Sequence, residues 1–301
     1  MRSAFLSRAL DFEHRACHWL LVQADLRRAI VLPIGSYLRV RARLACWLYR
    51  SSFCPTPDSP TRLIAALLKP GCVYVDAGAS FGDMSMIASV KVGPDGEVHA
   101  FEPHPTVFEA LQRAVEVGQF ENITPNRWLL AAVAGRVKFY LAPHTQSSST
   151  SQAFADSQNV NEIECDAVRL DDYWGTRPQT VDFMKLDVEG MEYPVLRGAA
   201  LVLQSSFPLL VLEITKASVR ATTFGYTLGE LLDLLSAIGY RYYAMRPSGL
   251  HPITGAQEIC ENDHDLFCLH ERSRLYQEAA LYACTFSTDR RVNAKSDIAQ
   301  G

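Results

Sequence analysis

Residues 73–82, Val-Tyr-Val-Asp-Ala-Gly-Ala-Ser-Phe-Gly, constrain the fold of this chain more than any other segment. A short apolar strand runs into Asp76, a turn containing Gly78 and Gly82 follows, and a helical pattern begins at once. Gly78 permits backbone angles that side chains oppose, and it lets the main chain come close to a ligand. A strand, a glycine turn and a helix in this order predict the first unit of an α/β fold with a nucleotide-type pocket.

The next predicted strand, residues 97–101, ends in Glu102, twenty residues beyond Gly82. A carboxylate in this position can accept hydrogen bonds from ribose hydroxyls. Dinucleotide folds need the spacing G-x-G-x-x-G, whereas here three residues separate Gly78 from Gly82, and Ser80 stands where the middle glycine would fall. Asp76 lies just ahead of the turn, and its charge would repel a pyrophosphate. An acid here suits a cationic ligand such as S-adenosylmethionine. The alternative is an ordinary strand-to-helix turn with a capping acid.

Strand and helix patterns alternate through the rest of the chain. The predicted strands are residues 73–76, 97–101, 128–130, 137–141, 181–186, 208–214, 240–245 and 265–270. The predicted helices are residues 61–69, 83–92, 105–117, 191–203 and 228–238. Repeated βα units followed by a terminal strand pair predict an α/β fold with a doubly wound, mostly parallel sheet and an antiparallel edge strand.

Composition divides the chain into three parts. Residues 1–60 are expected to form a helical N-terminal extension and a Pro-rich linker. The extension is basic, because the first 50 residues hold nine arginines and three acids. Residues 61–284 are expected to form the α/β domain, and residues 285–301 a disordered tail. The extension could pack on its own domain, join two copies into a homo-oligomer or touch an anionic surface.

Charge and hydropathy exclude several classes of protein. The net charge of −4 argues against a nucleic-acid partner. Charged residues interrupt the apolar segments near the start, so neither a transmembrane segment nor a secretory signal is predicted. The eight cysteines form no C-x-x-C pair. We therefore expect reduced cysteines and a cytoplasmic location.

The second informative segment is residues 181–192, in which a buried strand leads into three acids and Gly190. Ligands of open parallel sheets bind outside the carboxyl ends of the strands, so Asp187 should reach the same crevice as Glu102. Acids in the first turn of a helix complement its dipole, which accounts for Glu192 and for Glu189. It does not account for Asp187, which we place at the centre of the site.

These motifs resemble the FkbM family of S-adenosylmethionine-dependent methyltransferases. The resemblance rests on Asp76-Ala-Gly-Ala-Ser-Phe-Gly82, Phe101-Glu-Pro103, Lys185-Leu-Asp-Val-Glu-Gly-Met-Glu192 and Pro208-Leu-Leu-Val-Leu-Glu-Ile214, and it covers about residues 72–243. Ser80 stands where the family has an asparagine. The resemblance implies a Rossmann-like class I methyltransferase fold and O-methylation of a hydroxyl on a sugar, a glycan or a secondary metabolite. An N-methyltransferase and a catalytically silent, cofactor-binding scaffold remain as alternatives.

The resemblance also implies roles for individual residues. The cofactor site would comprise Asp76, Gly78, Ser80 and Gly82 around the methionine part, Glu102 at the ribose, Pro103 and His104 beside the adenosine, Ala131 at the adenine, and Asp187 closest to the reacting centre. Hydroxyl acceptors must lose a proton, and Glu189 and His144 are the candidate bases. Asp187 and Glu213 end adjacent predicted strands and are candidates to share a magnesium ion. A structural role for Glu213 as a buried acid is the alternative.

Overall fold

The computed structural model describes residues 60–141, 150, 161–214, 224–246, 248–260 and 263–286. The predicted N-terminal extension, His144 and the predicted tail beyond residue 286 lie outside the described residues. The domain boundaries near residues 60 and 284 therefore stay predictions. Within the described ranges, no helix is both long enough and apolar enough to cross a membrane.

Two sheets and the helices around them make up the described chain. The strands are β1 (Val73–Ala77), β2 (Glu97–Phe101), β3 (Ile123–Asn126), β4 (Leu129–Leu130), β5 (Gly135–Leu141), β6 (Asn161–Val168), β7 (Phe183–Leu186), β8 (Leu209–Glu213), β9 (Arg241–Arg246), β10 (Gly249–Ile253) and β11 (Asp265–Leu269). The helices are α3 (Pro60–Leu67), α4 (Asp83–Val92), α5 (Pro105–Gly118), α6 (Leu170–Trp174), α7 (Glu192–Gly198), α8 (Ala200–Ser206), α10 (Leu228–Ile238) and α11 (Tyr276–Phe286), with a 3₁₀ turn, η3 (Ala256–Glu258).

The large sheet has eight strands in the order β10-β9-β11-β8-β7-β1-β2-β3. The five strands from β8 to β3 pair in parallel, and β11, β9 and β10 add to them in antiparallel fashion. The chain winds outward from β1 through β2 to β3, then returns to the other side of β1 with β7. The predicted doubly wound sheet with an antiparallel edge is confirmed, and a ligand crevice is expected where the order reverses, between β1 and β7.

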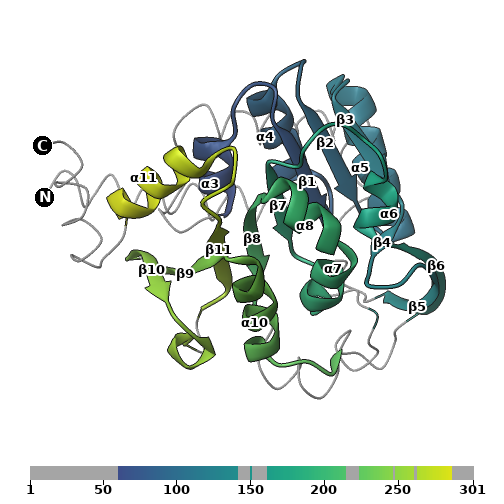
Figure 1. Ribbon diagram of the computed structural model, residues 1–301. Helices are drawn as coiled ribbons and strands as arrows, with labels where there is room; N and C mark the ends of the chain where they lie inside the picture. Colours follow the sequence, from purple (N-terminus) through teal and green to yellow (C-terminus); the bar gives the residue numbers. More distant parts are fainter. Residues whose placement is uncertain are drawn as a thin grey trace, which may run out of the picture.

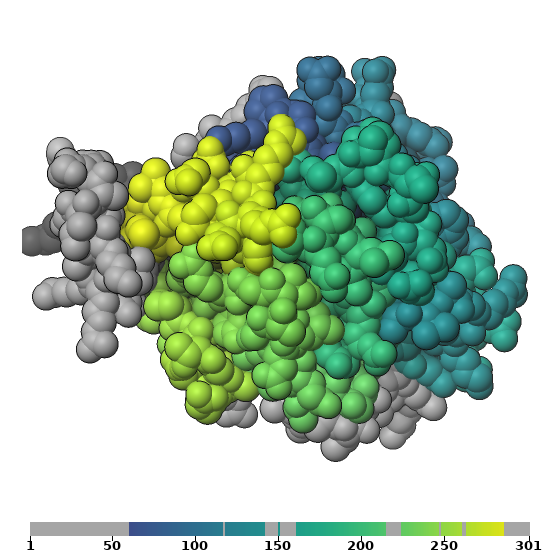
Figure 2. Space-filling view, viewed as in Figure 1, coloured from purple at the N-terminus to yellow at the C-terminus, as the bar shows by residue number. Residues whose placement is uncertain are grey.

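Helices cover both faces of this sheet (Figure 1). Helices α3, α4, α5 and α11 share one apolar cluster with it, and α6, α7, α8 and α10 share the other. Side chains alternate along each strand, so that Tyr74 packs into the first cluster while Val73 and Val75 pack into the second. The space-filling view shows the green side chains of α7, α8 and α10 over the second face, beside the yellow α11 (Figure 2).

The third strand was predicted in the wrong place. In the structure β3 (Ile123–Asn126) pairs with β2, whereas Leu129–Leu130 is β4 of a small second sheet with the order β4-β6-β5. Pro125 and polar residues weaken the strand pattern of β3, which an edge strand tolerates because one of its sides needs no partner. Strands β6 and β10 and helix α11 were not predicted at all.

One predicted helix, residues 191–203, is two helices in the structure. Helix α7 ends at Gly198, and α8 begins at Ala200. A Cβ atom on Gly198 would lie 2.0 Å from the carbonyl oxygen of Ala131. The break therefore lies where the helical layer packs against the backbone that follows β4.

Candidate active site at the carboxyl edge of the sheet

The turn after β1 depends on a glycine because two chain segments meet there. Gly78 has φ 75°, and a Cβ atom at this position would lie 1.8 Å from the carbonyl oxygen of Asp187. The amides of Gly78 and Ala79 donate to the carbonyl oxygen of Phe101 at 3.0 and 2.9 Å. Ser80 follows with φ 49°, a left-handed conformation that is uncommon for serine. The turn thus joins the ends of β1, β2 and β7.

Glu102 is held by main-chain amides on both of its carboxylate oxygens. Ser80 N donates to Oε2 at 2.9 Å, and His104 N donates to Oε1 at 2.8 Å. Burial raises the pKa of Glu102 to about 7, although both hydrogen bonds favour the charged form. Each oxygen of a carboxylate can accept a second hydrogen bond. The side chain is therefore fixed in place and still able to accept from two hydroxyls.

A pocket of about 320 Å³ lies along this edge of the sheet. It is lined by Gly78, Ser80, Phe101, Glu102, Pro103, Trp128, Leu129, Leu130, Phe139, Asp187, Val188, Glu189 and Glu213. The strand order places the apolar residues after β3 at one end, Glu102 next to them, and the acids after β7 and β8 at the other end. The described lining contains four acids and no lysine, arginine or histidine. Its chemistry suits a ligand with an apolar end and a cationic end.

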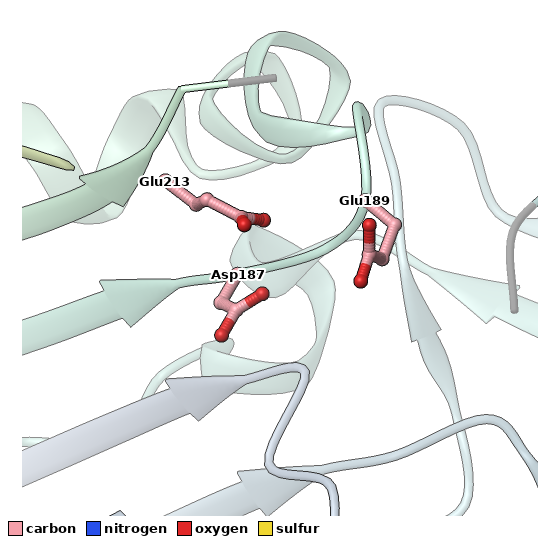
Figure 3. A group of neighbouring side chains, drawn as sticks. All are labelled: Asp187, Glu189 and Glu213. Carbon is pink, nitrogen blue, oxygen red and sulfur yellow. The ribbon is translucent and has the colours of Figure 1, made fainter. Parts of the chain in front are cut away.

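Three carboxyl groups gather at the acidic end, and Figure 3 shows them turned toward a common space. One oxygen from each of Asp187, Glu189 and Glu213 lies within 4.8 Å of the other two. We call these three residues the acid group. Glu213 Oε2 is buried and finds no hydrogen-bond donor among the described residues.

The three carboxyl groups of the acid group have different pKa values, so they are not all charged at the same pH. Burial, and then the charges of Asp187 and Glu189, raise the pKa of Glu213 to about 10. Burial, and then the charges of Asp187 and Glu192, raise the pKa of Glu189 to about 8. Burial also opposes ionisation of Asp187, but Lys185 and a hydrogen bond with Glu213 outweigh it and lower the pKa of Asp187. Near neutral pH, Asp187 therefore carries the negative charge of the group.

Lys185 is the cation that stabilises this charge. Its Nζ lies 3.1 Å from Asp187 Oδ2 and 3.6 Å from Asp76 Oδ1, and it donates to the carbonyl oxygen of Gly78 at 3.2 Å. Burial lowers the pKa of Lys185, yet the two acids more than offset this and raise it. Asp76 is fully buried and accepts a hydrogen bond from Ser85 Oγ at 2.5 Å.

Glu192 shapes the loop that carries the acid group. Its side chain is buried, and Oε1 accepts from Gly190 N at 3.1 Å and from Val188 N at 3.4 Å, while Oε2 accepts from Tyr226 Oη at 3.0 Å. Within this loop Glu189 has φ 53°, again left-handed. Glu192 therefore does more than complement a helix dipole, which was the role expected from the sequence.

The structure brings together most of the predicted site residues but not all of them. The pocket is lined by Gly78, Ser80, Glu102, Pro103, Asp187, Glu189 and Glu213. Asp76, Gly82, His104 and Ala131 are not in its lining. Asp76 lies beneath it, and a Cβ atom on Gly82 would lie 2.4 Å from Leu111. His104 caps α5, where its Nδ1 accepts from Val107 N, and the predicted base His144 lies outside the described residues.

The sequence reasoning missed three residues that the site uses. Lys185 lies two positions before Asp187, so the period of a strand already places both on one face. Trp128 and Phe139 line the apolar end of the pocket. Both lie in segments that were predicted as strands, residues 128–130 and 137–141, but the small second sheet that places these segments beside the pocket was not predicted.

Comparisons with known proteins identify the family of the chain. The family profile described as "Methyltransferase FkbM domain" matches residues 76–242, more than half of the chain. The chain is 28% identical to the 31-O-demethyl-FK506 methyltransferase FkbM of Streptomyces tacrolimicus over 250 residues, 73% of this chain and 92% of that protein.

Two further curated relatives match over a shorter range. Methyltransferase 1 of Beauveria bassiana is 28% identical over 142 residues, 41% of this chain and 57% of that protein. The hexuronic acid methyltransferase AglP of Haloferax volcanii is 28% identical over 144 residues, 48% of this chain and 56% of that protein. The chain thus spans little more than half the length of these two relatives.

Proposed function

The chain belongs to the FkbM methyltransferase family, and from this membership we propose that it uses S-adenosylmethionine to methylate a hydroxyl group of a sugar, a glycan or another small metabolite. The observation that carries the proposal is the joining of Glu102 and the acid group in one pocket. Two relatives support the acceptor class, because their names specify a hexuronic acid and a 31-O-demethyl compound.

The residues of the pocket fit this cofactor. Glu102 offers two free acceptor positions to the ribose hydroxyls, since each of its oxygens takes one main-chain hydrogen bond. Trp128, Leu129 and Phe139 offer apolar surface to the purine. The acid group lies at the other end, where a sulfonium and an ammonium would gain from negative charge. A volume of about 320 Å³ is within the usual range for small-molecule sites.

The acids of the pocket have different roles in methyl transfer. When bound, S-adenosylmethionine supplies an activated methyl group, which the acceptor oxygen takes by in-line displacement. Once it is ionised, Glu189 takes the proton that this oxygen gives up, because a pKa of about 8 makes its carboxylate a stronger base than an ordinary one. Asp187 stays ionised beside Lys185 and supplies negative charge at the cationic end of the cofactor. His144 remains a second candidate base.

A magnesium ion at Asp187 and Glu213 is a competing proposal for how the hydroxyl is activated. The acid group has the spacing to hold an ion, and Glu213 Oε2 is free to bind one. The ammonium of Lys185, however, already occupies Asp187 Oδ2. A chelator separates the two proposals: methyl transfer should persist in its presence if Glu189 is the base, and it should stop, and resume with magnesium, if the ion is required.

Cofactor binding is tested most directly at Glu102. Glu102→Ala removes the acceptors for two hydroxyls, and we expect the affinity for S-adenosylhomocysteine to fall about 10- to 100-fold in titration calorimetry. The matched control is Glu97→Gln, at the other end of the same strand and outside the pocket lining. Unchanged affinity in a folded Glu102→Ala protein would refute the proposed cofactor site.

The acceptor class has a chemical test. The protein is incubated with methyl-labelled S-adenosylmethionine and hexuronic acids or 31-O-demethyl-FK506, and the labelled product is treated with mild alkali. Transfer to a hydroxyl gives an ether, which keeps its label. Transfer to a carboxylate gives an ester, which releases the label as methanol, and this result would replace the hydroxyl with a carboxylate as the acceptor. Label on nitrogen, identified by mass spectrometry, would favour the N-methyltransferase.

A further inference from the structure

A chain of buried polar groups runs beneath the pocket from helix α4 to the acid group. Ser85 Oγ on α4 donates to Asp76 Oδ2, Asp76 Oδ1 faces Lys185 Nζ, and Lys185 Nζ reaches Asp187 Oδ2. The strand register explains the arrangement, because Asp76 on β1 and Lys185 on β7 are direct partners across the parallel pair. Both Asp76 and Lys185 are buried.

Lys185 does not lie where it would if its only role were to neutralise the charge of Asp76. Its Nζ lies closer to Asp187 Oδ2, at 3.1 Å, than to Asp76 Oδ1, at 3.6 Å. It also donates to the carbonyl oxygen of Gly78 at 3.2 Å. Gly78 and Asp187 line the pocket, whereas Asp76 does not. A buried ion pair is costly, and an apolar pair is often equally stable, so stability alone gives no reason for a cation in this place.

We propose that Lys185 is a positioning residue that holds the carbonyl group of Gly78 and the carboxylate of Asp187 where they receive the amino-acid end of the cofactor. The ammonium of Lys185 binds the carbonyl oxygen of Gly78, in the turn after β1, and the carboxylate of Asp187, after β7. It thereby fixes the distance between these two segments. Gly78 and Asp187, which both line the pocket, are thereby held in a fixed position relative to each other. Asp76, held by Ser85, is the counter-charge that keeps Lys185 in place.

This inference rests on the proposed use of S-adenosylmethionine, and it predicts a dependence on one part of the ligand. The charges of Lys185 and Asp76 act on Glu102 in opposite directions, so removing both should change the binding of the purine and ribose little. Binding of the amino-acid end should depend on Lys185. S-adenosylhomocysteine contains all three parts, and 5′-methylthioadenosine contains only the purine, the ribose and the thioether.

The experiment compares the Kd values of these two ligands for the full chain. Lys185→Met alone would leave Asp76 without a counter-charge and make the pocket more negative, so the test uses the paired variant Asp76→Asn/Lys185→Met, whose net charge equals that of the wild type. Lys69→Met is the matched control, because Lys69 pairs with Glu278 on α11 and does not line the pocket. Titration calorimetry gives the affinities.

We expect the paired variant to bind S-adenosylhomocysteine about tenfold or more weakly than the wild type, and 5′-methylthioadenosine within about twofold of it. Equal losses for both ligands would show that Lys185 only supports the fold and would overturn the inference. Unchanged affinity for both would overturn it as well. Failure of the wild type to bind either ligand would instead refute the proposed function. Binding of 5′-methylthioadenosine also shows that the variant is folded.

Discussion

Glu213→Gln should stabilise the protein at neutral pH, because the folded state keeps the wild-type side chain protonated. Burial and the neighbouring acids raise the pKa of Glu213 from 4.5 to about 10. Below pH 4.5 both the folded and the unfolded chain carry this proton, and the full stability is present. As the pH rises from 4.5 toward 10, the unfolded chain loses the proton and the folded chain keeps it. The wild type therefore loses stability across this window.

The size of the effect follows from the width of the window. Each pH unit contributes about 1.4 kcal/mol, so the interval from pH 4.5 to pH 7.5 gives at most about 4 kcal/mol. Glu213 borders the pocket, where solvent screens part of this, and we expect about 1–3 kcal/mol. Glutamine has no proton to lose, and its amide can still donate to Asp187. The free energy of unfolding should thus exceed that of the wild type by this amount at pH 7.5.

Urea denaturation at pH 4.5, 6.0 and 7.5, followed by circular dichroism, measures the difference. The two proteins should be equally stable at pH 4.5 and should diverge as the pH rises. Glu116→Gln, an exposed acid on α5, is the control whose effect should not grow with pH. A Glu213→Gln protein that is less stable at pH 7.5, or a difference that is constant across the three pH values, would show that Glu213 is an ordinary, ionised carboxylate.

Three further substitutions test the backbone of the site and one ion pair elsewhere in the fold. Ser80→Asn should raise the free energy of unfolding by about 0.5 kcal/mol in urea denaturation, because asparagine tolerates the φ of 49° better than serine does. Gly78→Ala places a Cβ atom 1.8 Å from the carbonyl oxygen of Asp187, and it should cost more than about 2 kcal/mol and abolish binding of S-adenosylhomocysteine in calorimetry. Arg274→Ala removes the ion pair to the buried Asp182, so thermal and urea denaturation should show a loss of about 1–2 kcal/mol with unchanged cofactor affinity.

The parts of the fold that the sequence predicts well are those with local signals. Helix α4 was predicted with the bounds it has because the glycine turn precedes it and Gly93 ends it, and α10 because its pattern is amphipathic and Gly239 ends it. Strand β3 was misplaced because its neighbour β2 supplies the hydrogen bonds that its own polar sequence does not suggest. Long-range pairing of this kind is not visible in a local pattern.

The residues of the site also differ in how far the sequence predicts them. The topological rule for parallel sheets predicts that Glu102, Asp187 and Glu213 gather at one edge, because each of them ends a strand. The role of Lys185 depends on which residue of β1 lies opposite it, and that register is known only from the structure. Asp76 was predicted to contact the cofactor because it begins the glycine turn, but its side chain points beneath the pocket toward Lys185.

Departures from ordinary backbone geometry provide a physical argument for the site that does not depend on the family. Four non-glycine residues among those described have positive φ: Ser80, Gln119, Glu189 and Phe207. Gln119 and Phe207 occupy the C-caps of α5 and α8, where a left-handed residue satisfies the last carbonyl groups of a helix. Ser80 and Glu189 cap nothing, and both line the pocket. Such strain costs about 1–3 kcal/mol per residue and persists where surrounding contacts enforce it. Glu102 and Glu192 supply those contacts, so the surroundings of the pocket hold its backbone in a conformation that packing alone would not favour.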